Sequence, residues 1–526
     1  MLEIPERMNA AGIFVDRNVR EGRGDKVAVI DTADGREYTY AQIQAMVNRV
    51  GNALRDTLDT RSGERVLCLL LDSPAFVASF FGAIKIGAVP IPTNTLMKPP
   101  DYEYFLNDSR ARVAIVSASL VPLVAPVLKN LHFLRHLVVV GDAQLDDVPL
   151  DISVHNFELL LTQASDRLEP LELSKDDACF WLYSSGTTGF PKGAIHLQHD
   201  MLICAENYAR GVLDINENDR TFSIAKLFFA YGLGNALYFP FYVGATTILY
   251  PGKPDPHTFY RIATDSKATL FFGVPTAYAA LLALPEEETR EYDLSSIRYG
   301  VSAGEALPPA LFERWKERWG SEILDGIGST EILHIFISNR GGVVRPGASG
   351  TPVPGYEARI VDEAGNDVPR GEVGDLLISG DSICAAYWNK HEKTKDTIIG
   401  RWIRTGDKYL QDEDGYFHYQ GRSDDMLKAG GIWVSPVEVE NTLMSHPAVL
   451  ECGVVGAEDD EGLIKPKAYV VLRSEYEGTD SLRRELIGYV KERIAVYKYP
   501  RWIVFVEQLP KTATGKIQRY KLRDLG

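Results

Sequence analysis

The segment from 40 to 145 alternates between stretches of helical length and short apolar runs, and this alternation restricts the fold more than any other feature of the chain. Strands that are separated by helices form βαβ units, whose strands lie parallel in one sheet. The pattern therefore predicts an α/β fold with mostly parallel sheets in the N-terminal part. The expected helices cover 40–58 and 75–86, and the expected strands cover 66–71, 113–116 and 137–140.

The later part of the chain changes character. Short alternating runs and turn residues between 350 and 420 predict a β-rich subdomain. Beyond 421-GRSDD-425 the pattern predicts a small α+β domain. Its expected elements are, in order, a helix at 437–445, strands at 449–455 and 468–472, a helix at 482–494 and a strand at 502–506.

Length supports a division into domains. A chain of 526 residues exceeds the size at which a single core keeps growing, so more than one domain is expected. The polar segment after Gly421 is the candidate hinge. We therefore expect a large N-terminal domain of several subdomains at 1–421, a hinge at 422–425 and a mobile C-terminal domain at 426–526.

The charge balance argues against two classes of partner. The chain carries 56 basic and 72 acidic residues, a net charge of −16, which disfavours non-specific binding to nucleic acid or to an anionic membrane. The opening residues, MLEIPERMNAAG, lack a basic segment followed by an apolar one, and no apolar run approaches the ~18 residues that span a bilayer. We therefore expect a cytoplasmic protein with no nucleic-acid and no membrane partner.

The cysteines and two closely spaced histidines are interpreted as structural residues. The cysteines are odd in number, far apart and mostly within apolar runs, which is typical of reduced core residues and not of a disulfide framework or a zinc site. His196 and His199 form an H-x-x-H pair without a carboxylate or cysteine partner, so we interpret them as capping or packing residues, not metal ligands. The cysteines are Cys68, Cys179, Cys204, Cys384 and Cys452.

The stretch 183-YSSGTTGFPKG-193 predicts an anion-binding loop. Its glycines let backbone amides approach an anion closely, and its hydroxyls can donate to phosphate oxygens. The Walker pattern requires a glycine directly before the lysine, but Pro191 stands there and Gly193 follows Lys192. The loop is therefore a phosphate-binding candidate of a different kind from the P-loop.

Four further regions join this loop in one pattern, namely 302-SAGE-305 with 325-DGIGSTE-331, 404-RTGD-407, 421-GRSDD-425 and 510-PKTATGK-516. Taken together and in this order, the regions resemble the adenylate-forming superfamily, which includes acyl-CoA synthetases, peptide-synthetase adenylation domains and luciferases. The resemblance covers nearly the whole chain. It implies that a carboxylate attacks the α-phosphorus of ATP, that pyrophosphate leaves, and that a thiol then attacks the mixed anhydride.

The resemblance implies a role for each matching residue in binding ATP. Glu331, next to Thr330, would hold the Mg²⁺ that bridges the phosphates, because Mg²⁺ prefers carboxylate oxygens. Asp407 would accept both ribose hydroxyls, and Arg422 would add a ribose or phosphate contact. The β- and γ-phosphates would lie on Ser184, Ser185, Gly186, Thr187, Thr188 and Gly189, with Lys192 as a nearby cation. The adenine would lie between Ser302, Ala303, Gly304 and Glu305 on one side and Asp325, Gly326, Ile327, Gly328 and Ser329 on the other.

One position in the adenine segment departs from the family pattern. Ile327 stands where the family usually places an aromatic residue, so an aliphatic contact would replace stacking on adenine. This departure bears on nucleotide affinity, not on the family.

Two lysines of the C-terminal domain match the family's catalytic positions. Lys516 would contact the acyl carboxylate and the α-phosphate during adenylation, since an ammonium holds together two anions that otherwise repel. Lys428 matches the lysine presented after the domain rotates about Asp424 to admit coenzyme A. Tyr497 and Lys498 are candidates for contacts with coenzyme A.

The resemblance also implies that Lys516 is open to modification, since many ligases of this type share its P-K-x-x-x-G-K pattern. Reversible acetylation would remove the charge that adenylation needs, so a protein lysine acetyltransferase and deacetylase are candidate partners.

The segment 226-KLFFAYGLGNALYFP-240 occupies the position of the acyl pocket in related enzymes. It holds no acidic residue that could bind a substrate amine, which argues against an amino-acid substrate. Its aromatic and small residues suit a flat slot for an unsubstituted ring. Together with the SAGEALP and STEILHIF segments it resembles benzoate-CoA ligases, whose substrates would be benzoate, ATP and coenzyme A. The expected pocket residues are Phe229, Ala230, Tyr231, Gly232, Gly328, His334 and Ile335.

Three alternatives stay open at this point. The chain could be a ligase for another small aryl acid, or a freestanding aryl-acid adenylation domain that passes its product to a carrier protein. A catalytically silent nucleotide-binding regulator is the third, but such a protein need not keep Glu331, Asp407, Arg422 and Lys516. The sequence leaves both a monomer and a homodimer open.

Overall fold

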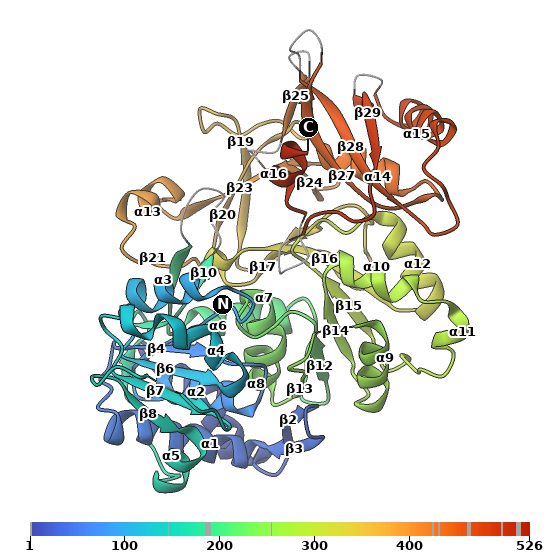
Figure 1. Cartoon of the computed structure of the whole chain (residues 1–526). Coiled ribbons are helices and arrows are strands. Elements are labelled where there is room, and N and C mark those ends of the chain that lie inside the picture. The colour runs from blue at the N-terminus through green and yellow to red at the C-terminus, as the bar shows by residue number, and fades with distance from the viewer. Residues whose placement is uncertain are drawn as a thin grey trace.

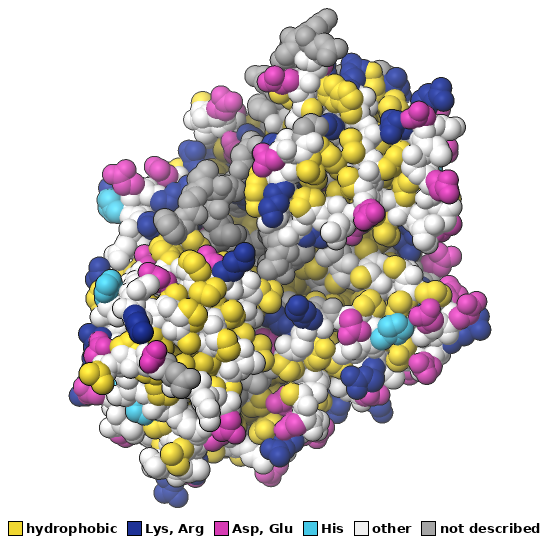
Figure 2. Space-filling model, in the orientation of Figure 1, with side chains coloured by type: hydrophobic (Ala, Val, Ile, Leu, Met, Phe, Trp, Pro, Cys, Tyr) yellow, Lys and Arg dark blue, Asp and Glu magenta, His cyan; other side chains and the backbone are white. Residues whose placement is uncertain are grey.

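The computed structural model describes most of the chain, and its elements form several sheets with helices around them (Figure 1). Within the described residues, no helix has the length and apolar character needed to cross a bilayer. Figure 2 shows acidic and basic side chains mixed over the face that it draws. The described residues are 3–145, 147–184, 191–253, 255–422, 426–429, 432–459, 464–495, 498–511 and 517–525.

The predicted alternation of strands and helices in the N-terminal part is confirmed. It forms a parallel sheet in the order β5-β4-β6-β7-β8. Thr39 caps the first helix with a reciprocal capping box to Gln42, and Ser73 caps the second. The strands are β4 (Arg65–Leu69), β5 (Val89–Pro92), β6 (Val113–Ser117), β7 (His136–Val140) and β8 (Ser153–Asn156), and the helices are α1 (Tyr40–Asn52), which continues as η3 (Ala53–Thr57), and α2 (Pro74–Lys85).

A larger sheet of nine strands lies beside the first and supports the predicted nucleotide segments. Its order is β18-β17-β16-β15-β14-β12-β13-β2-β3, with parallel pairing from β16 to β2 and antiparallel pairing at both ends. The strands are β2 (Val27–Asp31), β3 (Arg36–Thr39), β12 (Arg220–Ser223), β13 (Thr246–Leu249), β14 (Leu270–Gly273), β15 (Tyr299–Ser302), β16 (Glu322–Gly328), β17 (Ile335–Ser338) and β18 (Thr351–Pro352).

The largest apolar core connects the two sheets through helix α2, all of whose residues are buried. Phe81 of this helix packs against Phe14, with ring centroids 6.2 Å apart, and against Phe241, at 5.9 Å. The five cysteines are buried with free thiols, as predicted. Burial raises the pKa of the Cys68 thiol to about 12, so it is an inert core residue.

The β-rich region is also confirmed. An antiparallel sheet in the order β19-β20-β23-β22, with β24 paired to β23, covers the predicted segment. A separate antiparallel sheet, β10-β11-β21, holds the two ends of the predicted phosphate loop. The strands are β19 (Glu357–Val361), β20 (Gly374–Ser379), β22 (Ile398–Ile399), β23 (Trp402–Gln411), β24 (Phe417–Arg422), β10 (Ala178–Ser184), β11 (Lys192–Leu197) and β21 (Ala386–Tyr387).

The C-terminal part has the predicted order of helix, strand, strand, helix and strand, and it has its own apolar core. Figure 1 shows it in orange to red at the top of the view, beside the β-rich region and above the nine-stranded sheet. Strand β28 pairs antiparallel with β27 and parallel with β29. The elements are β25 (Leu427–Ala429), β26 (Ile432–Val434), α14 (Pro436–Met444), β27 (Val449–Glu458), β28 (Ile464–Leu472), α15 (Asp480–Arg493), β29 (Trp502–Phe505) and α16 (Arg519–Asp524).

The remaining elements are short or lie at the periphery of the sheets. They are β1 (Arg7–Met8), η1 (Gly12–Asp16), η2 (Val19–Arg23), α3 (Pro99–Ser109), η4 (Ala118–Leu120), α4 (Val121–Val124), η5 (Ala125–Asn130), α5 (Phe157–Gln163), β9 (Leu173–Ser174), α6 (Asp200–Cys204), η6 (Ala205–Arg210), α7 (Ala230–Leu233), η7 (Gly234–Tyr238), α8 (Phe239–Val243), α9 (Pro256–Asp265), α10 (Pro275–Ala283), α11 (Glu286–Thr289), α12 (Pro309–Trp319), η8 (Thr330–Ile332) and α13 (His391–Thr397).

Candidate active site

A cavity of about 1180 Å³ lies where the nine-stranded sheet, the β-rich region and the C-terminal part meet. Residues from all three line it, including Ile517 and Arg519 of the C-terminal part. Most of the described residues that the sequence assigned to ATP lie on its wall. These are Ser184, Lys192, Gly304, Glu305, Asp325, Gly326, Ile327, Gly328, Ser329, Thr330, Glu331, Asp407 and Arg422.

Glu331 is held at one end of this cavity by donors from two strands. It lies in the short helix η8 after β16, where Ser329 accepts the N–H of Ile332 at 3.2 Å and so caps the turn. Its Oε1 accepts from the hydroxyl of Ser184 at 3.0 Å and from that of Tyr387 at 2.8 Å. The carboxylate is therefore fixed in position before any ligand binds.

A cation lies beside this carboxylate. The Nζ of Lys192 lies 4.8 Å from the centre of the Tyr387 ring. Burial lowers the pKa of Lys192, and the charge of Glu331 opposes this effect. A carboxylate next to a lysine suits a metal-bound polyphosphate, since Mg²⁺ is commonly held by one or two carboxylates together with substrate phosphates. Among the residues that the structure describes, no cluster of three or more His, Cys, Asp or Glu side chains forms a separate metal site.

Asp407 and Arg422 face each other on adjacent strands of the β-rich sheet. Nη1 of Arg422 donates to Oδ1 of Asp407 at 3.0 Å and to the carbonyl of Thr405 at 3.2 Å. Gly406, between the two anchors, has a φ of +76°, and a Cβ there would lie 2.9 Å from Nη2 of Arg422. The T-G-D turn therefore needs glycine to bring the carboxylate and the guanidinium together.

The two predicted adenine segments lie on neighbouring parallel strands. Ser302, the last residue of β15, pairs in register with Asp325 in the middle of β16, and residues 304–306 and 325–332 line the cavity. Burial raises the pKa of Asp325 well above its ordinary value, which favours a neutral carboxyl beside an uncharged base. Ser302 and Ala303 are buried and are not among the described residues that line the cavity.

One contact connects these segments to the C-terminal part. Oε1 of Glu305 accepts the backbone N–H of Ile517 at 3.0 Å. The residue that follows the predicted catalytic Lys516 is therefore in contact with the cavity wall.

Two of the predicted acyl-pocket residues, Tyr231 and Gly328, lie against His334, and Gly328 also lines the large cavity. Nε2 of His334 lies 3.0 Å from Oδ1 of Asn235 and 3.3 Å from the carbonyl of Tyr231. Burial lowers the pKa of His334 to about 3, so its imidazole is neutral. A Cβ on Gly234 would lie 2.4 Å from the His334 ring, which explains the glycine there.

The large cavity includes little of this cluster. Of the predicted pocket residues, Gly328 is among the described residues that line it. Not among them are Phe229, Ala230, Tyr231, Gly232, His334 and Ile335.

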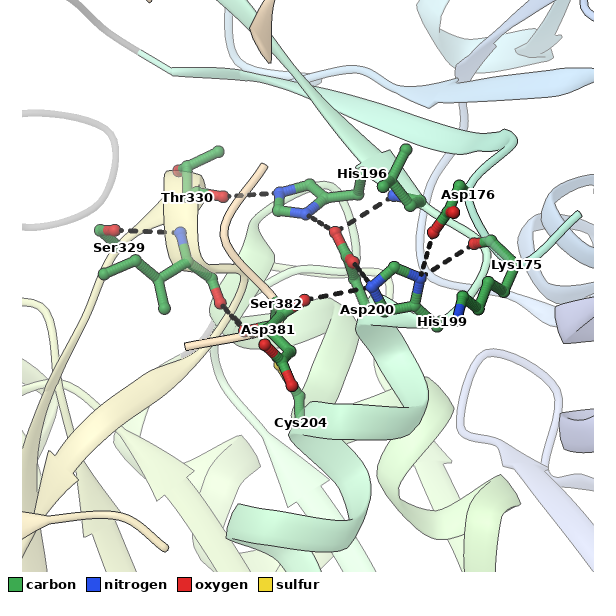
Figure 3. Close-up of polar contacts among 12 residues, drawn as sticks. Lys175, Asp176, His196, His199, Asp200, Cys204, Ser329, Thr330, Asp381 and Ser382 are labelled. Carbon is green, nitrogen blue, oxygen red and sulfur yellow. Dashed lines mark hydrogen bonds and ion pairs between the residues drawn. The ribbon is translucent and has the colours of Figure 1, made fainter. Parts of the chain in front are cut away.

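The interpretation of the two histidines as lacking a carboxylate partner is wrong. Nδ1 of His196 lies 2.8 Å from Oδ2 of Asp200, and Nε2 of His199 lies 3.4 Å from Oδ1 of the same residue (Figure 3). The signal was present in the sequence, because Asp200 follows His196 by four positions in a segment that turns from strand to helix.

Sequence reasoning also missed three tyrosines. Tyr387 contacts Glu331, whereas Tyr183 and Tyr104 connect the phosphate loop to helix α3. Tyr183, before the loop, donates to Oδ2 of Asp108 at 2.7 Å, and Tyr104 donates to the carbonyl of Pro191, after the loop, at 2.8 Å. Tyr183 begins the quoted loop stretch, and no motif marks Tyr104 or Tyr387; all three contacts arise from tertiary packing, which the sequence does not show.

Several predicted residues lie outside the part of the chain that the structure describes. For Lys428 the backbone lies in β25, and its side chain falls outside that part. Nζ of Lys498 donates to both carboxylate oxygens of Glu438, at 2.7 and 2.6 Å. The residues outside the described ranges are Ser185, Gly186, Thr187, Thr188, Gly189, Asp424, Tyr497 and Lys516.

The chain is similar to known enzymes over nearly its whole length. It is 52% identical over 523 residues to a benzoate–CoA ligase of Thauera aromatica, which covers 99% of this chain and 97% of that protein. The solved structure of the anthranilate CoA ligase AuaEII in complex with anthranoyl-AMP matches it with a TM-score of 0.94 and 47% identity, over 99% of this chain and 98% of that one. A benzoate CoA ligase from Burkholderia xenovorans LB400 matches with a TM-score of 0.89 and 46% identity, over 98% and 100%.

Two family models also match. The model described as AMP-binding enzyme matches residues 15–388, and the model described as AMP-binding enzyme C-terminal domain matches residues 438–516. The resemblance found in the sequence is thus confirmed, and the chain belongs to the family of AMP-binding enzymes.

Proposed function

We propose that the protein is an AMP-forming ligase that joins benzoate to coenzyme A. In the first step a benzoate oxygen bonds to the α-phosphorus of ATP, and pyrophosphate leaves with the electrons of the broken P–O bond. In the second step the thiolate of coenzyme A bonds to the acyl carbon of benzoyl-AMP, and AMP leaves. The observation that carries the proposal is that one cavity is lined by Glu331, Lys192 and Asp407, three charged groups suited to metal, phosphate and ribose.

The roles of the cavity residues in the first step follow from their chemistry. In-line attack of one anion on another requires neutralisation at the attacking and leaving oxygens. Mg²⁺, when bound at Glu331, would supply part of this charge. We assign the phosphates to the loop that begins at Ser184, with Lys192 beside it, and the ribose to Asp407 with Arg422. The adenine would lie between the segments that begin at Ser302 and Asp325.

The aryl pocket is assigned to the cluster around His334. A neutral imidazole surrounded by Tyr208, Tyr231 and Phe239, with ring centroids at 5.3, 5.6 and 4.4 Å, favours an uncharged aromatic ring over an amine. Ligation of another small aryl acid is the second candidate. The similarity to an enzyme named anthranilate CoA ligase favours it.

The two half-reactions would use two faces of one mobile domain. We propose that residues 426–526 rotate about Asp424 relative to 1–421, so that Lys516 serves adenylation and Lys428 serves thiolation. Support for the adenylation face comes from the contact between Glu305 and Ile517, next to Lys516. Acetylation of Lys516 would remove its charge and stop the first step, which makes a lysine acetyltransferase and a deacetylase the proposed regulatory partners. The cytoplasm is the proposed location because ATP and coenzyme A are available there.

A panel of acids tests this function. The panel contains benzoate, fluorobenzoates, aminobenzoates, cinnamate and hexanoate, and AMP release is measured with and without coenzyme A. We expect benzoate to have the highest kcat/KM. For acids with a para substituent larger than fluorine, kcat/KM should be about 10- to 200-fold lower. A higher kcat/KM for cinnamate or hexanoate would contradict the aryl slot. Pyrophosphate release with benzoate, together with AMP release that does not respond to coenzyme A, would favour an adenylation domain.

A further inference from the structure

A buried histidine–aspartate pair lies directly behind the candidate metal ligand. His196 is near the end of β11 and Asp200 begins α6, and both side chains are fully buried. Nδ1 of His196 lies 2.8 Å from Oδ2 of Asp200, and its Nε2 lies 2.8 Å from the carbonyl oxygen of Thr330 (Figure 3). Oδ2 of Asp200 also accepts the N–H of Leu197 at 3.1 Å. The imidazole therefore connects a fixed carboxylate to the backbone of the turn that carries Glu331.

The positions of the hydrogens follow from the partners. A carbonyl oxygen can only accept, so Nε2 of His196 carries a hydrogen and donates it to Thr330. A proton also lies between Nδ1 and Oδ2 of Asp200, since otherwise two lone pairs would face each other at hydrogen-bond distance. The Phe180 ring stacks on the imidazole at 5.3 Å and fixes the ring plane. The link thus has one orientation and one donor directed at Thr330.

The turn behind Glu331 has all three of its carbonyls bonded. His196 holds the carbonyl of Thr330, the N–H of Cys384 donates to the carbonyl of Glu331 at 2.7 Å, and the hydroxyl of Ser382 donates to the carbonyl of Ile332 at 2.8 Å. Of these three anchors, His196 comes from the strand that also carries Lys192. Residues four apart on one strand share a face, so His196 and Lys192 extend toward the same side of β11.

We propose that His196 is a positioning residue for the metal-binding end of the cavity. Held by Asp200, it fixes the carbonyl of Thr330, and this orients the carboxylate of Glu331 toward Ser184 and Tyr387. It thereby sets the spacing between Glu331 and Lys192, the two groups that would face a metal-bound polyphosphate. The inference rests on the proposed function, because it assigns the purpose of the link to Mg²⁺·ATP.

Three substitutions separate the two hydrogen bonds of the link. His196→Gln keeps a donor at the reach of Nε2 and thus the bond to Thr330. His196→Asn keeps a donor at the reach of Nδ1 and thus the bond to Asp200, but it removes the imidazole donor from the carbonyl of Thr330, which retains the N–H of Leu333 at 3.3 Å. Asp200→Asn replaces the carboxylate with an amide, whose oxygen can still accept a hydrogen bond from the imidazole but carries no full charge. His418→Gln is the matched control, because His418 also lies 2.8 Å from an aspartate, Asp412, and is far from the turn in sequence.

The primary readout is binding, measured by calorimetry on the full chain with ATP plus Mg²⁺ and with ATP plus a chelator. Loss of an outer partner of a metal ligand typically costs about 10- to 100-fold in metal affinity. We expect His196→Asn to weaken Mg²⁺·ATP binding by about 10-fold or more while the affinity for metal-free ATP stays at the wild-type value. His196→Gln should stay within about 3-fold of wild type, Asp200→Asn should be intermediate, and His418→Gln should be unchanged.

Kinetics give the second readout. In His196→Asn, kcat for pyrophosphate release should fall while KM for benzoate stays constant, and conversion of supplied benzoyl-AMP to benzoyl-CoA should be unaffected. Equal effects of Asn and Gln, or equal weakening of metal-bound and metal-free ATP, would overturn the positioning role. A wild-type protein that binds no Mg²⁺·ATP would instead overturn the proposed function. If the enzyme prefers an acid other than benzoate, the comparison of Mg²⁺·ATP binding among the variants still tests the positioning role, because it does not depend on the acid.

Discussion

Ser184 and Glu331 lie 147 positions apart in the sequence, and their side chains meet through a hydrogen bond of 3.0 Å. Ser184 ends strand β10, where the predicted phosphate loop starts, and Glu331 lies in the turn after β16. The contact therefore joins the two regions that would have to act on the same phosphate groups. Tyr387 donates to the same carboxylate oxygen at 2.8 Å and completes the arrangement.

Tyr387→Phe removes one of the two donors to Glu331 without changing the ring. A hydrogen bond to a charged group contributes about 1.5–3 kcal/mol, so we expect Mg²⁺·ATP to bind about 10-fold more weakly or worse. The measurement is the dissociation constant of Mg²⁺·ATP by calorimetry. Tyr416→Phe is the control, since its hydroxyl contacts the carbonyl of Val343 at the surface. Equal affinities in the two variants would remove Tyr387 from the site.

Asp407→Asn tests the ribose assignment. An ionised carboxylate accepts hydrogen bonds from both ribose hydroxyls, and an amide accepts fewer and weaker ones. We expect wild type to bind ATP more tightly than 2′-deoxy-ATP, and the variant to lose most of this preference together with about 10-fold in ATP affinity. Asp414→Asn, which disrupts an exposed ion pair with Arg345, is the control. A preference for ATP that survives in Asp407→Asn would show that the ribose is bound elsewhere.

The two lysines should separate the two half-reactions. Lys516→Ala should slow pyrophosphate release by about 10²–10³-fold, the range for losing one preorganised group that stabilises charge, and still convert supplied benzoyl-AMP. Lys428→Ala should do the reverse. The measurement is pyrophosphate release without coenzyme A, compared with consumption of coenzyme A from synthetic benzoyl-AMP. Equal losses of both activities in both variants would contradict the rotating domain.

His334 should make stability depend on pH. Its pKa is about 3 in the folded protein, below the ordinary 6.5, so below pH 6.5 the unfolded chain takes up a proton that the native state does not. The contribution of His334 to the free energy of unfolding is therefore fully present above pH 6.5. It declines as the pH falls and is about 2 kcal/mol smaller at pH 5.

His334→Gln should remove that part of the decline. The measurement is the drop in Tm between pH 7.5 and pH 5, which should be smaller in His334→Gln than in wild type. His257→Gln, at an exposed position, should keep the wild-type drop. A drop that is the same in all three proteins would mean that His334 is solvated.

The predicted elements of the fold match the structure because they depend on local patterns. Apolar periodicity and capping residues such as Thr39 and Ser73 mark helix starts directly. Boundaries were less accurate where tertiary contacts compete. The strand predicted to reach residue 71 ends at Leu69, and the N–H of Leu71 donates to the side chain of Ser117 at 3.0 Å instead of to a strand.

The sequence predicts the site residues that lie in recognisable motifs, but not those that tertiary packing brings to the site. Glu331, Lys192, Asp407 and Arg422 lie in recognisable segments, and the structure places them around one cavity. Tyr387 is on a two-residue strand without a motif, and its contact with Glu331 depends on how β21 pairs with β11. The link from His196 to Thr330 spans 134 positions, so the spacing of His196 and Asp200 alone could not reveal its purpose.

The balance of products tests the central claim most directly. Purified protein is incubated with benzoate, ATP, Mg²⁺ and coenzyme A, and all products are quantified by chromatography. If both half-reactions occur at one cavity, benzoyl-CoA, AMP and pyrophosphate form in equal amounts. Without benzoate no product forms, and without coenzyme A the reaction stops after a single turnover to benzoyl-AMP. Formation of ADP and phosphate, or continued AMP release without benzoyl-CoA, would contradict the account.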